Sequence, residues 1–499
     1  MAAPFSSSLP LVESFDSEYL LYNRIFPLSV ADGRLRVAVA GDPAPEVLDD
    51  LADEYQCELD LVTVDEEELA DAVRRTFAAA ESMDGFARSL DGEVGIDDDG
   101  AWGGNAVEAD ARDLANQPPV IRFVNLLIRE AHESRASDVH LEATARGMVV
   151  RFRVDGVLTE APAPPAQLQR AVVSRVKLLA ELDIAERRVP QDGRIRIRLE
   201  ERELDLRVST VPTLHGESVV LRLLDQGGRP VTLEELGMMP ETLARFRRLA
   251  SRSSGILLAT GPTGSGKTTS LYAALGLRDA RAEKIITVED PIEYHLSGVT
   301  QVPVNVKAGV SFAAALRSLL RQDPDVLMVG EMRDSETAHI AVQAAMTGHL
   351  VFSTLHTNDA ASALTRLADL DIESYMVAAT VEAILAQRLV RRVCSECTER
   401  YRPDPAMVRM LAPVSADGVE LTRGAGCARC RGTGFRGRTG LFELLEVTKD
   451  IREEVQGSCD VTRIREMARD EGMVTLREDG WARVRAGITT IDEVLRVAS

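Results

Sequence analysis

The segment GPTGSGKTTS, from Gly261 to Ser270, constrains the fold of this chain more than any other. It fits the pattern G-x-x-x-x-G-K-[ST], whose glycines let backbone N–H groups close around phosphate oxygens. The apolar run GILLATG before it predicts a buried strand, and the Ala- and Leu-rich run TTSLYAALGL after it predicts a helix. This strand–loop–helix order indicates a nucleoside triphosphate site and disfavours a glycine-rich turn with an incidental lysine.

The residues of this segment have distinct expected roles. Lys267 is expected to reach the β- and γ-phosphates, and the Thr268 hydroxyl to ligate Mg²⁺. The helix that follows adds a partial positive charge at its N-terminus. The predicted nucleotide-binding residues are Gly261, Pro262, Thr263, Gly264, Ser265, Gly266, Lys267, Thr268 and Thr269.

Length and charge limit the alternatives. A chain of 499 residues is long enough for about three domains. Its net charge of −21 and aromatic content of 4% argue against tracking along DNA or RNA, so no nucleic-acid partner is expected. No apolar run approaches the roughly 18 residues that span a bilayer, and the N-terminus lacks the basic start of a signal peptide. We therefore expect a cytoplasmic protein that reaches a membrane only through partners.

Four parts are expected along the chain. Residues 1–80 contain alternating runs, RLRVAVA and ELDLVTV, among helical segments, and predict a small α/β unit. Residues 81–117 predict a flexible linker, because the stretch from Glu81 to Ala115 contains ten acidic residues and only two basic ones. Residues 118–228 hold alternating runs after a helix and predict an α+β domain. Residues 229–499 form the nucleotide-binding domain.

Three further apolar runs in that last part end in polar residues. The segments are KIITVEDPIEY, DVLMVGEMRD and GHLVFSTLHTNDA, with strands predicted at Ile285–Val288, Val326–Val329 and Leu350–Leu355. In open parallel sheets, ligands bind at the carboxyl ends of strands. Together with the strand before the phosphate-binding segment, these runs predict a parallel sheet covered by helices on both faces.

The three runs deliver different chemical groups. The first delivers Glu289 and Asp290, candidates for completing the water shell of the metal. The second has Gly330 and Glu331 where a Walker B strand usually ends in Asp, so the longer Glu331 is expected to polarise the attacking water. The third delivers His356, which alone is weak evidence. Acidic residues after strands are often only solvated turns, but three such ends beside a phosphate loop favour a catalytic site.

Four of the six cysteines form two Cys-x-x-Cys pairs. Cys394 and Cys397 are separated from Cys427 and Cys430 by 29 residues, which are expected to form a small excursion with its own helix. Four thiolates suit tetrahedral zinc in a structural site. A redox pair or disulfides are the alternatives, and a cytoplasmic setting disfavours them. Cys57 and Cys459 are interpreted as packing residues.

The segments GPTGSGKTTSLY, ITVEDPIEY, LLRQDPDVLMVGEMRD and TGHLVFSTLHTNDA resemble the phosphate loop, Asp box, Walker B and His box of secretion ATPases. These are the hexameric motors of type II secretion and type IV pilus assembly. The resemblance extends upstream through ASDVHLE and PQDGRIRIR and downstream through LAQRLVRRVCSEC and GRTGLFELL. It covers residue 118 to the C-terminus, with a looser likeness in residues 16–80.

The resemblance implies a RecA-like P-loop ATPase domain preceded by a PAS-like α+β domain and a small N-terminal α/β domain. A zinc-binding subdomain is expected at about residues 390–440, and ATP between the two core domains of a ring. Arginines of both domains are expected at the phosphates, with surface ion pairs as the alternative. By motif position the catalytic set is Glu331, Lys267, Glu289, His356, Arg207 and Arg222, and Arg194, Arg317, Arg321 and Arg333 are added to the nucleotide-binding set.

The implied function is a hexameric ATPase that drives type II secretion, of the family called general secretion pathway protein E. It would couple ATP hydrolysis to assembly of the secretion pseudopilus and export of folded proteins. The expected cofactors are ATP, Mg²⁺ and Zn²⁺. The expected partners are further copies of the chain, a bitopic inner-membrane adaptor at the N-terminal domain, and an inner-membrane platform protein. A type IV pilus assembly ATPase is the alternative.

Other classes are disfavoured by particular features. A pilus retraction motor would lack the cysteine region. A helicase or packaging motor does not suit the acidic chain. No N-K-x-D element for guanine is present, so a GTP-dependent switch is disfavoured, and the acidic residues Glu289 and Glu331 argue against a binding module with a degenerate loop.

Overall fold

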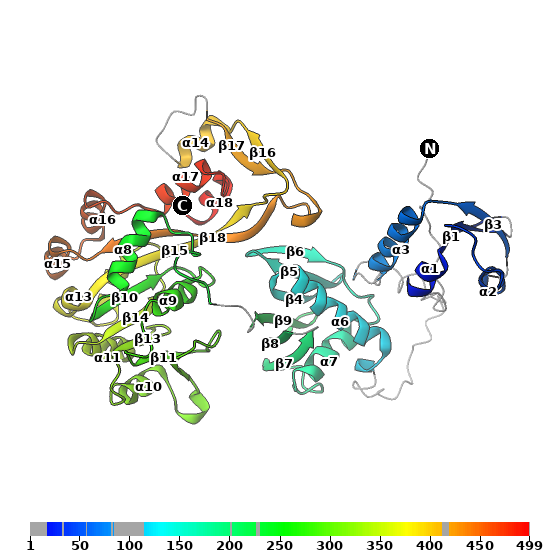
Figure 1. Cartoon of the computed structure of the whole chain (residues 1–499). Coiled ribbons are helices and arrows are strands. Elements are labelled where there is room, and N and C mark those ends of the chain that lie inside the picture. Colours follow the sequence, from blue (N-terminus) through cyan, green and yellow to red (C-terminus); the bar gives the residue numbers. More distant parts are fainter. Residues whose placement is uncertain are drawn as a thin grey trace. The chain divides into compact units, whose positions relative to one another are not determined.

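The computed structural model describes residues 17–31, 34–55, 57–80, 83, 114–199, 202–225, 230–411 and 419–498. The chain divides into two compact units, Met1–Leu224 and Asp225–Ser499 (Figure 1). Most of the linker predicted at residues 81–117 therefore lies outside the described residues, which include only Met83 and residues 114–117 of it. No helix in the described part of the chain is long and apolar enough to cross a membrane.

The first unit begins with a three-stranded sheet in the order β1-β2-β3. Strands β1 and β2 are antiparallel, whereas β2 and β3 are parallel. Both strands and both helices predicted from the alternating and helical runs are present. Strand β1 was not predicted, because its sequence IFPLSVA does not alternate and contains a proline beside a register shift. The elements are α1 (Ser17–Asn23), β1 (Ile25–Ala31), β2 (Arg34–Val39), α2 (Pro45–Tyr55), β3 (Glu58–Thr63) and α3 (Glu66–Ala80).

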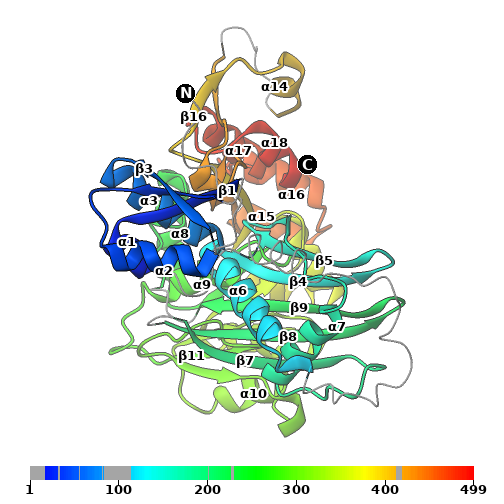
Figure 2. The same ribbon diagram turned by 90° about the vertical axis from the view of Figure 1, so that its right-hand side faces the viewer.

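The same unit contains a six-stranded sheet in the order β6-β5-β4-β9-β8-β7. Helices α6 and α7 cover one face of it (Figure 2). The apolar stripe of α6, with Val120, Phe123 and Leu127, packs in that core, while the charged residues of the strands lie on the opposite face. The elements are α6 (Pro118–Glu133), β4 (Ala136–Thr144), β5 (Gly147–Val154), β6 (Val157–Ala161), α7 (Gln169–Leu179), β7 (Gln191–Leu199), β8 (Arg202–Thr213) and β9 (Gly216–Asp225).

The second unit is built on a seven-stranded sheet in the order β12-β11-β13-β14-β10-β15-β18. The first six strands are parallel, and β18 is antiparallel to β15. Four of the parallel strands, β10, β11, β13 and β14, were predicted, whereas β12 and β15 were not. The strands are β10 (Gly255–Thr260), β11 (Ile285–Glu289), β12 (Thr300–Pro303), β13 (Val326–Val329), β14 (Leu350–Leu355), β15 (Val381–Val393) and β18 (Phe435–Glu446). The long antiparallel pair at one edge was not predicted.

Helices cover both faces of this sheet, which is why its central strands are apolar throughout. On β10, Leu257 and Ala259 face a core with α8 and α9, whereas Ile256 and Leu258 face a core with α11 and α12. The helices are α8 (Pro240–Ala250), α9 (Lys267–Leu275), α10 (Phe312–Leu319), α11 (Ser335–Met346), α12 (Ser362–Asp369), α13 (Ser374–Thr380), α15 (Lys449–Gln456), α16 (Val461–Asp470), α17 (Leu476–Arg485) and α18 (Ile491–Val497), with a 3-10 turn η1 at Val306–Ala308.

A small subdomain is inserted between β15 and β18. It contains β16 (Thr398–Tyr401), α14 (Pro405–Leu411), β17 (Leu421–Gly424) and the 3-10 turn η2 (Ala428–Cys430). The antiparallel pair β16–β17 and helix α14 form the excursion that was predicted between the two cysteine pairs.

Candidate functional site

The phosphate loop, residues 261–266, joins β10 to α9 and requires glycine at both ends. Gly261 and Gly266 adopt φ angles of 147° and 85°. A Cβ atom at Gly261 would lie 2.5 Å from the carbonyl oxygen of Gln387, and one at Gly266 would lie 2.8 Å from Nε2 of the same residue. The two fixed glycines of the motif are therefore explained by close packing as well as by backbone conformation.

Lys267 is the first residue of α9, and its side chain is buried against the loop. Its Nζ donates to the carbonyl oxygens of Gly261, at 2.7 Å, and Pro262, at 3.1 Å. Burial lowers the pKa of Lys267 to about 8; the charge of Glu331 opposes this, and that of Arg388 reinforces it. A buried ammonium in this position is suited to pair with an anionic phosphate.

Glu331, Arg333 and His356 are brought together at the carboxyl ends of β13 and β14. Arg333 Nη2 lies 2.6 Å from Glu331 Oε1, and His356 Nε2 lies 3.5 Å from Glu331 Oε2. The hydrogen bond that Arg333 donates to the Glu331 carboxylate raises the pKa of Arg333. Because β13, β14 and β10 are neighbouring parallel strands, these residues and Lys267 lie at the same edge of the sheet, and the charge of Glu331 acts on Lys267.

Glu289, at the end of β11, is placed differently. It is buried, and both of its carboxylate oxygens accept hydrogen bonds inside the domain: Tyr272 and Thr287 donate hydroxyl groups, and Gln301 Nε2 lies at 3.2 Å. Burial and this carboxylate raise the pKa of Tyr272. Glu289 therefore anchors β11 to α9, and its role in the reaction stays a prediction. Asp290, the next residue, is exposed.

The predicted arginines of the second unit form different contacts. Arg317, in α10, pairs with Glu336 in α11. Arg321 is exposed and donates to the carbonyl oxygen of Arg317 at 2.9 Å. Their approach to a nucleotide stays a prediction, whereas Arg333 is held beside Glu331.

The predicted arginines of the first unit lie on the charged face of the six-stranded sheet. Arg194 in β7 stands opposite Arg207 in β8. Arg222 in β9 donates through Nε to Asp138 Oδ1 at 2.9 Å, and its side chain is 58% exposed. The neighbouring strand residues on the other face are buried in the core, so these guanidinium groups point away from it.

Two residues at the site were not singled out by the sequence. Gln387 and Arg388 are buried in the middle of β15, just after the segment that pairs with β10, and lie beside the phosphate loop. Ser270 donates to Gln387 Oε1 at 2.7 Å, and Arg388 Nη2 donates to the carbonyl oxygen of Asn358 at 2.7 Å. Adjacent polar residues inside the apolar run VEAILAQRLV were the available signal.

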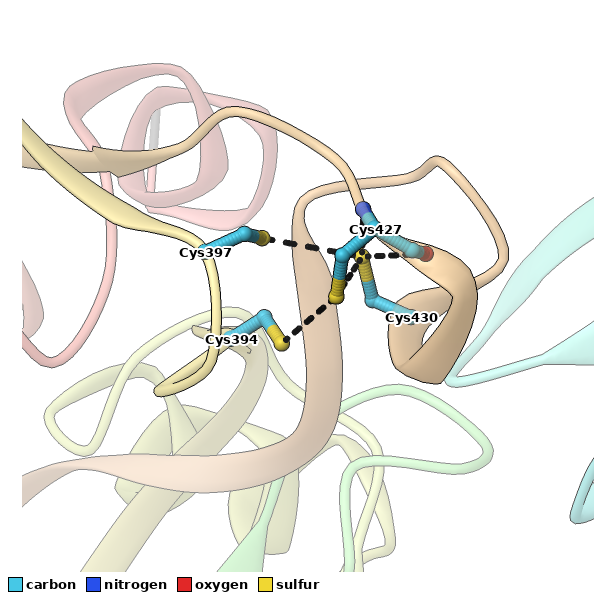
Figure 3. Close-up of side chains that lie close together, drawn as sticks. All are labelled: Cys394, Cys397, Cys427 and Cys430. Atoms are coloured by element: carbon cyan, nitrogen blue, oxygen red, sulfur yellow. Dashed lines mark hydrogen bonds between the residues drawn. The ribbon is translucent and has the colours of Figure 1, made fainter. Parts of the chain in front are cut away.

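The four predicted cysteines converge from two segments of the inserted subdomain (Figure 3). Their sulfur atoms all lie within 4.8 Å of one another. Cys394 and Cys427 are 3.9 Å apart, and Cys397 and Cys430 are 3.8 Å apart. A tetrahedral zinc with Zn–S bonds of about 2.3 Å would place its sulfurs roughly 3.8 Å apart, so the arrangement fits such an ion.

Backbone donors support the same interpretation. The N–H groups of Cys427 and Gly434 point at Cys430 Sγ, at 3.1 and 3.3 Å, and that of Gly426 points at Cys397 Sγ at 3.3 Å. Burial opposes ionisation of Cys430, but the N–H groups of Cys427 and Gly434 and the thiols of Cys427 and Cys397 outweigh it and lower the pKa of the Cys430 thiol. Burial raises the pKa of the Cys397 thiol, against the effect of the Gly426 N–H. All six cysteines are free thiols, and a set of thiolates with N–H donors is the chemistry of a structural metal site.

Comparison with known proteins agrees with this geometry. The family model described as "Type II/IV secretion system protein" matches residues 113–496, and the MshEN domain matches residues 2–83. Type II secretion system protein E of Xanthomonas campestris pv. campestris is 44% identical over 492 residues, covering 98% of this chain and 85% of the relative. Type II secretion system ATPase E of Vibrio cholerae is 45% identical, covering 82% of each chain. Type II secretion system protein HxcR of Pseudomonas aeruginosa is 50% identical, covering 78% and 79%.

Solved structures give the same picture of the fold. The pilus retraction motor PilT with bound ADP superposes with a TM-score of 0.50 at 27% identity, covering 74% of this chain and 95% of that one. The Legionella pneumophila ATPase DotB superposes with a TM-score of 0.55 at 20% identity, covering 75% and 95%, and supports the fold alone. The chain belongs to the type II secretion system protein E family of type II/IV secretion system proteins, and it is an ATPase.

Proposed function

We propose that the chain is the motor of a type II secretion system, which uses ATP hydrolysis to assemble the secretion pseudopilus and export folded proteins. The observation that carries this proposal is the convergence of Lys267, Glu331, Arg333 and His356 at one sheet edge. It occurs in a chain that is 45% identical to a type II secretion system ATPase.

The residues suggest a division of labour in hydrolysis. The phosphates would lie along residues 261–269, with Lys267 exchanging its carbonyl contacts for the β- and γ-phosphate oxygens. Mg²⁺, held through the Thr268 hydroxyl, would neutralise charge on those phosphates. Glu331 would orient the attacking water, while Arg333 and His356 hold its carboxylate in place.

The arginines of the first unit would complete the site in an assembled ring. Phosphoryl transfer builds negative charge on the terminal phosphate, and a guanidinium group stabilises it with two hydrogen bonds. Arg194, Arg207 and Arg222 stand together on one charged sheet face, and Arg222 is held there by Asp138. Arg317 and Arg321 would join them from α10. We propose that the assembled ring is a hexamer.

The cysteine cluster would hold one structural Zn²⁺. Cys394 and Cys397 follow β15, and Cys427 and Cys430 precede β18, so the metal would close the inserted subdomain at its base. Four protein thiolates leave no open coordination position, which argues against a catalytic metal.

The partners follow from the family and its N-terminal domain. The MshEN match and the separate three-stranded sheet support docking of residues 17–80 to a bitopic inner-membrane adaptor. The ring would act on an inner-membrane platform protein, from the cytoplasm and in peripheral association with the membrane. Type IV pilus assembly is the alternative. The relatives described above are type II secretion proteins, which favours type II secretion.

A complementation experiment separates the two functions. In the source bacterium the gene is deleted and restored as wild type or as Lys267→Ala, and exported proteins and surface pili are measured. Type II secretion predicts that export is lost in the deletion and the variant and returns with wild type, while pili persist. Loss of pili with intact export would instead identify a pilus assembly motor.

A further inference from the structure

We propose that Gln387 and Arg388 are positioning residues that hold the phosphate loop and the loop after β14 in one fixed arrangement for ATP hydrolysis. The second loop, residues 356–361, begins with His356 and ends at α12 and is called the His356 loop below. The inference rests on the ATPase activity assigned above, and it adds two residues that act through other groups rather than by touching the reacting atoms.

Gln387 lies against the phosphate loop at two points and holds the helix that follows it at a third. Its side-chain Oε1 accepts the Ser270 hydroxyl at 2.7 Å, and both side chains are buried. Its carbonyl oxygen and its Nε2 lie against Gly261 and Gly266, close enough to exclude a Cβ atom at either position. One residue of β15 therefore packs against both ends of the loop: its backbone carbonyl lies at Gly261, and its side chain supports Gly266 and the helix that follows.

Arg388 connects that support to the His356 loop. Its Nη1 donates to the carbonyl oxygen of Gln387 at 3.1 Å, and its Nη2 donates to that of Asn358 at 2.7 Å. Asn358 lies two residues after His356, whose ring is 3.5 Å from Glu331. A planar guanidinium can make both bonds at once, which a lysine ammonium at the same place cannot reproduce.

The far side of the His356 loop is anchored as well. Buried Glu443 of β18 accepts the backbone N–H of Ala360 at 2.8 Å, and Arg465 of α16 lies 3.0 Å from Asp359. Glu443 and Asp359 also supply the negative charge that opposes the cost of burying Arg388. The loop is thus clamped between β15, β18 and α16.

A second, independent tie joins the His356 loop to the end of β10, directly before the phosphate loop. The hydroxyl groups of Thr260, at the end of β10, and Thr357 lie 2.7 Å apart, and the Thr357 N–H donates to Thr260 Oγ1 at 2.9 Å. With this tie in place, loss of the Arg388 bond should loosen the His356 loop without detaching it. The expected result is a defect in turnover greater than any defect in folding.

Arg388→Lys is the primary test, with Arg392→Lys as the matched control on the same strand. Arg392 is exposed. In the full-length protein, kcat of Arg388→Lys should fall by about 10- to 100-fold, the scale of a misplaced catalytic group. KM, the affinity for a non-hydrolysable ATP analogue, and the unfolding temperature should stay close to wild type. Arg392→Lys should match wild type throughout.

A second, smaller substitution tests the role of Gln387 at the phosphate loop. Ser270→Ala removes one hydrogen bond to Gln387 without altering β15. It should raise KM and weaken analogue binding, and adding Gln387→Ala should give less than the product of the two single effects, because both remove the same contact. Independent effects of the two substitutions would overturn the Gln387 role.

The Arg388 role is overturned if Arg388→Lys keeps the wild-type kcat, or if kcat falls only in step with the loss of folded protein. The secretion proposal fails separately, since a wild-type protein that hydrolyses ATP but does not restore export would leave these kinetic comparisons intact.

Discussion

Glu331 and His356 meet from neighbouring parallel strands, with 3.5 Å between Glu331 Oε2 and His356 Nε2. The other carboxylate oxygen is held by Arg333 at 2.6 Å. Arg333 and His356 thus hold the two carboxylate oxygens of Glu331 from opposite sides. They fix the orientation of this glutamate, which stands where a Walker B strand usually ends in aspartate.

Replacing Glu331 with glutamine should remove hydrolysis but not nucleotide binding. The amide keeps the shape of the side chain, but it cannot accept a proton from water, and loss of a general base costs about 10²- to 10⁴-fold in rate. ATPase turnover and analogue affinity are the two measurements. Glu241→Gln is the control, because Glu241 is an exposed residue of α8. Near wild-type turnover in Glu331→Gln would remove it from the role of base.

The pH dependence of kcat/KM should report the deprotonation of Lys267. This parameter follows ionisations of the free enzyme, and burial lowers the pKa of Lys267 from 10.5 to about 8. The protonated form is the one that pairs with phosphate, so kcat/KM should fall as the pH rises above about 8. In Lys267→Arg the arginine stays charged at high pH. The variant should be slower than wild type, but its kcat/KM should not fall as the pH rises above about 8. A flat wild-type profile between about pH 7.5 and 9.5 would contradict the assignment.

Two tyrosines that pack edge to face should differ in what their hydroxyl groups contribute. Tyr272 donates to the buried Glu289 carboxylate, whereas the Tyr294 hydroxyl is buried without a partner among the described residues. Tyr272→Phe should lower the free energy of unfolding by about 1.5–3 kcal/mol, as for a hydrogen bond to a charged group. Tyr294→Phe should change it little, or stabilise. Denaturant titration measures both, and equal losses would argue against the Glu289 network.

Metal removal should act on the inserted subdomain. Purified protein is expected to carry about one zinc per chain, because a site of four cysteine thiolates binds one zinc ion. Cys430→Ser should lose that zinc and become sensitive to proteolysis between β15 and β18, while Cys459→Ser, outside the cluster, should keep it. Elemental analysis with limited proteolysis checks both outcomes, and a zinc-free protein with an intact subdomain would refute the site.

The sequence alone located the phosphate loop and the strand ends that carry Glu331 and His356. Buried parallel strands are apolar along their whole length, so a charged residue at the end of such a run stands out. The cysteine pairs are equally local, because the spacing within each pair already suits one metal. These features depend on neighbours in the chain, which a sequence displays directly.

Only the tertiary structure decided the rest. Gln387 and Arg388 lie beside the phosphate loop only because β15 pairs with β10 in the folded sheet. The same contact, together with the backbone conformation, explains why positions 261 and 266 are glycine. Glu289 follows a strand just as Glu331 does, yet Tyr272 and Gln301 hold it inside the domain. A side chain's direction is set by what packs around it, and those neighbours come from distant parts of the chain.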